Sequence, residues 1–299
     1  MHGKVIFHCG AAKTGSTTIQ NYLWHQRKIL RRQGIHYCPR FLRSGNVDAL
    51  NIAIKNMRRS GGNKAAIAQG RERLKQLFDG DGYDTVIISN ESALGDPFKD
   101  DVNGFFPLHK SALESAARLF EGYAVSPVFF VRNQATMLRS FYGQRVRQGA
   151  AYSLEGFASR AQNFDLSWCP VVESLRQTFG ATQTEVCKFE DFTENPAAYI
   201  LGLFSKLLET EVLKVKEPVF KNNAPKSSGL AAMRSFNKGI DHLPGFSNMN
   251  RIKLKKLVRR GVFPVLEMLP GKHAGVLPAA LQVDLAQQYK ADLGQIYAD

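Results

Sequence analysis

Residues 4–18 read Lys-Val-Ile-Phe-His-Cys-Gly-Ala-Ala-Lys-Thr-Gly-Ser-Thr-Thr, an apolar run followed by a loop that contains two glycines. The run is short and rich in apolar residues, which predicts a buried strand over Lys4–Cys9. A helical pattern follows directly over Ser16–Leu30. Backbone N–H groups of such a loop and of the first helical turn converge on one point. The stretch therefore predicts a site for an anionic group at the end of the first strand.

Similar apolar runs recur along the chain and alternate with longer helical patterns. We expect further strands at Thr85–Ser89, Pro127–Val131 and Thr184–Phe189, and helices over Lys64–Phe78, Lys110–Phe120, Gln134–Gln148 and Leu166–Phe179. This alternation is typical of an α/β fold, in which helices flank a parallel sheet on both faces. After about Pro218 the pattern becomes helical. We expect one domain over residues 1–299, with a nucleotide-binding core at about 1–215 and a helical C-terminal lobe at about 216–299.

Composition limits the partners and the cellular location. The formal net charge of +14 indicates an anionic partner, such as a phosphorylated small molecule, nucleic acid, an acidic glycan or an anionic membrane. The four cysteines show no spacing typical of zinc sites or of a disulfide framework. No stretch approaches the roughly eighteen apolar residues that a membrane helix needs. The sequence therefore predicts a soluble, cytoplasmic chain.

The first loop departs from the pattern of nucleotide triphosphatases. Gly10 and Gly15 have the spacing of a P-loop, but Ser16 stands where those enzymes place a lysine, and Lys13 is the one lysine in the loop. The second predicted strand is followed by Asn90, where a magnesium site would place an aspartate. These departures disfavour hydrolysis of ATP or GTP.

Residues 7–19, Phe-His-Cys-Gly-Ala-Ala-Lys-Thr-Gly-Ser-Thr-Thr-Ile, resemble the 5′-phosphosulfate loop of sulfotransferases that use 3′-phosphoadenosine 5′-phosphosulfate (PAPS), the bacterial ones in particular. The resemblance implies a three-layer sandwich like that of P-loop nucleotide triphosphatases. It also implies that the loop lysine and hydroxyls hold the 5′-phosphate and the sulfate. In this chain the corresponding residues are Lys13, Thr14, Gly15, Ser16, Thr17 and Thr18.

A second anchor is predicted at the end of the strand Pro127–Val131. Arg132 leaves this strand, and Ser140 follows it eight residues later. A guanidinium suits a phosphate because it offers paired donors. The pair resembles the 3′-phosphate motif of the same family, although Gln134 stands where many members have proline. The resemblance extends to Lys226, in a basic, Asn-rich segment, which could contact the 3′-phosphate or be a solvated lysine.

Residues 186–191, Val-Cys-Lys-Phe-Glu-Asp, resemble a strand and acidic turn that many members of the family share. We interpret this segment as a structural turn.

The predicted chemistry is the transfer of a sulfuryl group from PAPS to a hydroxyl or amine, leaving 3′-phosphoadenosine 5′-phosphate. Such a transfer depends on in-line positioning and on stabilising charge at the leaving oxygen, so no metal is required. The resemblance implies that Lys13 neutralises this oxygen and that Ser140 draws Lys13 aside until the acceptor arrives. It also suggests a carbohydrate or glycolipid acceptor.

The acceptor's proton needs a base, and two kinds of residue are candidates. Glu91 comes just after a strand, at the sheet edge where open α/β folds bind ligands. It could instead cap the following turn or pair with a cation. Among the histidines, His8 falls within the first strand and is expected in the core, whereas His36 and His109 are expected in loops.

Two other functions compete with this one. A kinase or nucleotide triphosphatase with a displaced loop lysine would turn over ATP with magnesium. A basic nucleic-acid-binding protein would explain the charge, but the chain has no zinc-finger pattern and no aromatic RNA-binding motif, so we expect no nucleic acid partner.

Residues 251–260 combine a run of lysines and arginines with Leu254, Leu257 and Val258. Such a helix at about residues 250–260 is usually a solvated face above a buried apolar stripe. It could instead contact an acidic glycan or an anionic membrane.

Overall fold

The computed structural model describes residues 3–40, 47–59, 63–98, 104–211, 213, 227–262, 265 and 277–298. The chain forms two compact units. The first comprises residues 1–132, 167–220 and 295–299, and the second comprises residues 133–166 and 221–294. The prediction of one domain over the whole chain stays a prediction.

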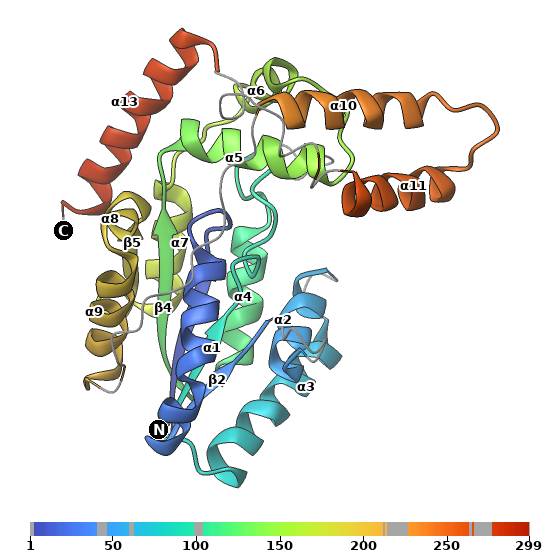
Figure 1. The fold of residues 1–299 in the computed structure, drawn as a ribbon. Coiled ribbons are helices and arrows are strands. Elements are labelled where there is room, and N and C mark those ends of the chain that lie inside the picture. Colours follow the sequence, from blue (N-terminus) through green and yellow to red (C-terminus); the bar gives the residue numbers. More distant parts are fainter. Residues whose placement is uncertain are drawn as a thin grey trace. The chain divides into compact units, whose positions relative to one another are not determined.

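The first unit is built on a sheet of five parallel strands in the order β2-β3-β1-β4-β5 (Figure 1). The strands are β1 (Lys4–Gly10), β2 (Ile35–Cys38), β3 (Thr85–Ser89), β4 (Ala124–Val131) and β5 (Glu185–Lys188). The chain passes from β1 to the edge strand β2, returns to β3 beside β1, and then crosses to β4 on the other side of β1. This order places the loop after β1 at the reversal of strand order, where open α/β sheets bind ligands.

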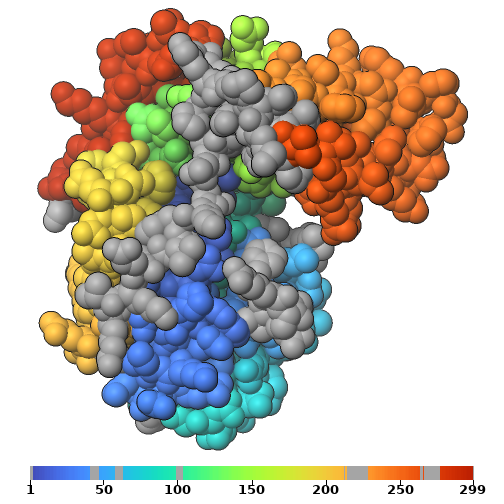
Figure 2. Space-filling model, viewed as in Figure 1, coloured from blue at the N-terminus to red at the C-terminus, as the bar shows by residue number. Residues whose placement is uncertain are grey.

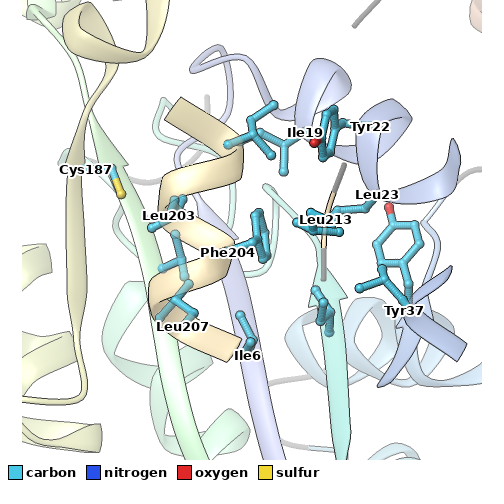
Figure 3. Packing of buried hydrophobic residues seen from close by; sticks show 14 of the residues in the cluster. Ile6, Ile19, Tyr22, Leu23, Tyr37, Cys187, Leu203, Phe204, Leu207 and Leu213 are labelled. Carbon is cyan, nitrogen blue, oxygen red and sulfur yellow. The ribbon is translucent and has the colours of Figure 1, made fainter. Parts of the chain in front are cut away.

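Helices cover both faces of this sheet. On one face, α1 (Ser16–Arg32) and α9 (Pro196–Leu208) pack with Ile6 and Phe130 (Figure 3). On the other face, the Phe7 ring meets the Phe120 ring at 5.0 Å, at the end of α4 (His109–Leu119). Successive side chains of a strand therefore pack against helices on opposite faces of the sheet, as the pleated backbone requires. The predicted α/β fold with helices on both faces is confirmed.

The other helices of this unit are α2 (Ala49–Arg59), α3 (Lys64–Lys75) with a π-helical turn at Gln76–Gly80, α7 (Cys169–Phe179) and α8 (Phe189–Glu194). Four elements of this unit differ from the sequence-based expectation. The edge strand β2 and the helices α2 and α9 were not predicted, and the segment after β5 forms the helix α8 instead of a turn. The differences at β2 and α8 affect the candidate site.

The described part of the second unit is helical and includes α5 (Gln134–Arg147), α6 (Leu154–Ala161), α10 (Ser227–Asp241), α11 (Asn248–Gly261) and α13 (Ala279–Ile296, whose last two residues belong to the first unit). Gln134 is buried at the start of α5, and its amide donates hydrogen bonds to the Leu166 carbonyl at 3.2 Å and to the Asp292 carboxylate at 2.7 Å. A proline at position 134 could make neither bond. This network accounts for the departure from the proline expected there.

The predicted basic helix is present as α11, but its apolar stripe is only partly buried. Val258 is buried, Leu254 is half-buried, and Leu257 is 68% exposed. The expectation of a buried stripe is therefore wrong for Leu257. Within the part of the chain that the structure describes, no helix has both the length and the apolar character that crossing a bilayer demands.

Candidate functional site

The loop between β1 and α1 has the geometry of an anion site. Gly15 caps α1 in the left-handed conformation, with φ 79°, and no side chain caps the helix. The first turn contains no acidic residue. Because uncapped first-turn amides and the helix dipole both favour negative charge, this geometry suits an anion.

Lys13 is held in an uncommon backbone conformation. Its φ is 72°, in the left-handed region that costs a non-glycine residue about 1–2 kcal/mol. Two hydrogen bonds fasten the surrounding loop: the Thr14 hydroxyl donates to the Ala11 carbonyl at 2.5 Å, and the Ala11 N–H donates to the Phe130 carbonyl at 3.3 Å. A third joins Lys13 itself, whose carbonyl accepts from Arg132 Nη1 at 2.6 Å. The loop shape is thus set by β4 as well as by β1.

Arg132 is itself positioned by two aromatic side chains. Its guanidinium lies 4.4 Å from the centre of the Phe189 ring, a cation–π contact, and its carbonyl accepts from the Trp168 indole at 2.9 Å. Trp168 is fully buried. The structure therefore brings the Arg132 side chain to the Lys13 backbone. Their roles at the two ends of a nucleotide stay predictions.

The helix α8 supports both anchors, and the sequence interpretation missed this role. Phe189 lies against Arg132, whereas a Cβ added to Gly15 would collide with the ring of Phe192. The two phenylalanines are three residues apart, so they share one face of the helix, and their rings lie 5.9 Å apart. This spacing was the available signal for a helix where we interpreted a turn.

The hydroxyl residues of the loop differ in exposure. Thr14 is fully buried and its hydroxyl is used within the loop, and Ser16 is 6% exposed. Thr17 is exposed and Thr18 is half-buried, with its N–H bonded to the Gly15 carbonyl at 2.8 Å. Binding of a phosphate by this set stays a prediction.

Glu91 follows β3 beside the loop. A Cβ built on Gly10 would lie 3.8 Å from the Glu91 carbonyl oxygen. Its carboxylate accepts a hydrogen bond from the Gln20 amide at 2.7 Å through Oε2, and pairs with Arg40 through Oε1. Because each carboxylate oxygen has two lone pairs, Glu91 retains the capacity to accept a proton while both partners hold it in place.

His8 is confirmed as a core residue. It is fully buried, and its Nδ1 lies 2.8 Å from the Ser89 hydroxyl. Burial lowers the pKa of His8 to about 4, although the nearby Glu91 charge acts in the opposite direction. The imidazole is therefore neutral at pH 7, and its burial leaves a substrate no access to it.

The other two histidines were expected in loops, and this expectation is wrong. His36 lies in β2, with Nε2 3.7 Å from the Asp48 carboxylate, and His109 begins α4 and bonds the Phe106 carbonyl at 2.7 Å. His36, Cys38 and Asp48 bring possible metal ligands within 4.8 Å of one another, a grouping found once among the described residues. Arg73 lies 3.3 Å from the same Asp48 oxygen, so the cluster already contains a cation.

Two predicted residues remain, Ser140 and Lys226. Ser140 lies on α5 in the second unit and is half-buried. Lys226 lies outside the described residues. Their roles at the 3′-phosphate stay predictions.

Comparisons with known proteins give a likeness of fold. No protein-family model matches the chain, and no curated protein sequence matches it. A sulfotransferase from Alicyclobacillus acidocaldarius has a similar crystal structure, with 16% identity, a TM-score of 0.46, and coverage of 73% of this chain and 85% of that chain. The sulfotransferase domain from the curacin biosynthetic pathway is also similar, with 16% identity, a TM-score of 0.40, and coverage of 96% and 98%. At these values the likeness carries no conclusion about activity.

Gly15→Ala should disrupt the loop more than an equivalent change at Gly82. Both glycines have positive φ. A Cβ built on Gly82 would have no atom within 4 Å, whereas a Cβ built on Gly15 would collide with the ring of Phe192. We expect Gly15→Ala to lower the free energy of unfolding by about 2–4 kcal/mol and Gly82→Ala by about 1–2 kcal/mol, measured by urea denaturation. Equal losses would show that Phe192 does not support the loop.

His8 should make the protein less stable in mild acid. Unfolding returns the His8 pKa from about 4 to 6.5, so the unfolded state takes up a proton between these values. From this group we expect a loss of about 2 kcal/mol between pH 7 and pH 5, complete near pH 4. Urea unfolding at several pH values should give a shallower pH slope for His8→Asn.

The exposed His25 supplies a matched control. His25→Gln should keep the wild-type slope. His109, whose pKa is also lowered by burial, contributes equally to all three proteins. Equal slopes for wild type and His8→Asn would contradict the assignment.

Proposed function

We propose that this chain is a sulfotransferase that takes the sulfuryl group from PAPS and passes it to a hydroxyl or amine. One observation carries the proposal: the Arg132 guanidinium at the end of β4 donates to the Lys13 carbonyl in the loop after β1. The residues Lys13 and Arg132, which follow two adjacent parallel strands, thus contact each other at the carboxyl end of the sheet. A donor with phosphates at its 5′ and 3′ positions needs two cationic residues.

The loop residues are assigned to the 5′ end of the donor. The amides of the first turn of α1 and the hydroxyls of Ser16, Thr17 and Thr18 would surround the 5′-phosphate. Lys13 would stabilise negative charge on the phosphate oxygen as its bond to sulfur breaks and the acceptor's bond to sulfur forms. Arg132, with Ser140 and Lys226, would hold the 3′-phosphate.

Glu91 is the proposed base. It would take the proton that the acceptor's hydroxyl or amine loses as the new bond to sulfur forms. Gln20 and Arg40 hold its carboxylate beside the loop, which is the positioning that a general base requires. The acceptor is proposed to be a carbohydrate or glycolipid.

Calorimetry can test the two-anchor site directly. We expect 3′,5′-adenosine bisphosphate to bind the full chain at least 10-fold more tightly than AMP or ATP. Arg132→Ala should weaken bisphosphate binding by about 10- to 100-fold, the value of charge-assisted hydrogen bonds. AMP binding should weaken by a smaller factor, because the loop loses only its bond from Arg132 to the Lys13 carbonyl. The exposed Arg32 offers a charge-matched control, and Arg32→Ala should change neither affinity.

Two results would contradict this assignment. If Arg132→Ala lowered the affinities for the bisphosphate and for AMP by the same factor, Arg132 would act only by holding the backbone of Lys13 in place. If ATP with magnesium bound best and was hydrolysed, the chain would be a nucleotide triphosphatase.

Glu91→Gln should separate catalysis from donor binding. Transfer of radiolabelled sulfate from PAPS to a panel of mono- and disaccharides should fall by about 100-fold in kcat, the usual contribution of a general base. The bisphosphate affinity should stay within about two-fold of wild type, because the neutral amide keeps the shape of the carboxylate. The acid limb of the pH–rate profile should also disappear. An unchanged profile would exclude Glu91 as the base.

A further inference from the structure

The hairpin α10–α11 exposes an unusual set of side chains. The two helices contact each other, and Arg251 of α11 donates to the Leu243 carbonyl in the connection at 3.1 Å. Nine large apolar side chains are exposed in the described parts of the chain, and five of them lie in this hairpin and its connection. They are Phe236, Phe246, Met249, Ile252 and Leu257, with exposures of 46, 43, 65, 67 and 68%.

The charge of the same segment is almost entirely positive. Residues 227–262 contain eight lysines and arginines and a single acidic residue, Asp241. Asp241 is paired with Lys255 at 2.7 Å, and Lys255 also donates to the Gly149 carbonyl at 2.8 Å. Lys255 therefore belongs to the packing of the second unit, and the exposed cations are other residues.

The exposed face of α11 carries both kinds of side chain together. Helical spacing places Met249, Lys253, Lys256 and Arg260 in one row along this face. Ile252 and Leu257 flank the row, and Val258 lies on the opposite, buried face. Apolar and cationic side chains thus project from the same surface of a helix of fourteen residues. Figure 2 shows this hairpin in orange at the surface of the protein.

We propose that α11 docks on a membrane surface rich in anionic lipids. Lysines and arginines are attracted to anionic headgroups, and exposed apolar side chains gain free energy by entering the headgroup boundary. A soluble polyanion would pair with the lysines and arginines, but it would leave the apolar side chains of Met249, Ile252 and Leu257 exposed to water. A second copy of this face is disfavoured as the occupant, because it would bring like charges together. This docking is independent of the proposed sulfotransferase activity.

Vesicle flotation with the full chain tests the proposal. The probes are vesicles of phosphatidylcholine alone and of phosphatidylcholine with about one third phosphatidylglycerol. We expect at least 10-fold stronger binding to the anionic vesicles at physiological salt. Each cation near such a surface contributes about five-fold, so a triple substitution should lower binding by about 100-fold. The three changes are Lys253→Gln, Lys256→Gln and Arg260→Gln.

A second variant separates the apolar contribution from the charge. Met249→Ser, Ile252→Ser and Leu257→Ser together should lower vesicle binding by about 10-fold or more. The remaining binding should vanish in 0.5 M salt, because the Debye length falls from about 8 Å at physiological salt to about 4 Å. These residues are exposed, so far-UV circular dichroism should match wild type. Matched controls should bind as wild type: Lys28→Gln, Arg31→Gln and Arg32→Gln on α1, and Ile52→Ser with Val283→Ser for the apolar set.

Three outcomes would overturn the proposal. The first is equal binding to neutral and anionic vesicles. The second is full binding by the triple serine variant together with equally tight binding to heparin, which would assign the face to a soluble polyanion. The third is concentration-dependent self-association in sedimentation velocity that the serine variant abolishes.

Discussion

The hydrogen bond from Arg132 to the Lys13 carbonyl is the contact on which the candidate site depends. It joins the end of one central strand to the loop that leaves its neighbour. Lys13 has a positive φ, which a lysine adopts only when its surroundings hold it there. The guanidinium contributes to that restraint, and its own position depends on Phe189 and Trp168. The shape of the loop is therefore a property of the sheet and of the layers packed on it.

The sequence predicted the parts of the fold that follow from local pattern. β1, β3 and the second half of β4 are runs of mostly buried residues, and α1 begins where the glycine loop ends. The strand β2 was missed because it has only four residues and includes the polar His36. The helix α8 was missed because its acidic residues suggested a turn, whereas packing of Phe189 and Phe192 stabilises it as a helix.

In the candidate site, too, some residues could be predicted from local sequence pattern and others could not. Lys13, Arg132 and Glu91 were candidates because each follows a strand, and the carboxyl ends of parallel strands lie together. For Lys13 and Arg132 the resemblance of their motifs to those of sulfotransferases added to this. Their supporting residues could not be predicted. Gln20 is 71 positions from Glu91, and Trp168 is 36 positions from Arg132, so only the folded chain shows these pairs. The exposure of Leu257 is likewise decided by which face of α11 packs, and three-residue spacing alone does not say which.

The short helix α8 limits how the candidate site could change during evolution. One of its phenylalanines lies under the guanidinium, and the other fills the space that a side chain at Gly15 would need. A mutation that moved this helix would displace both contacts at once. The loop at Gly15 and the guanidinium of Arg132 would then be unable to diverge separately, and a change in the spacing between them would require replacing the aromatic pair as a unit.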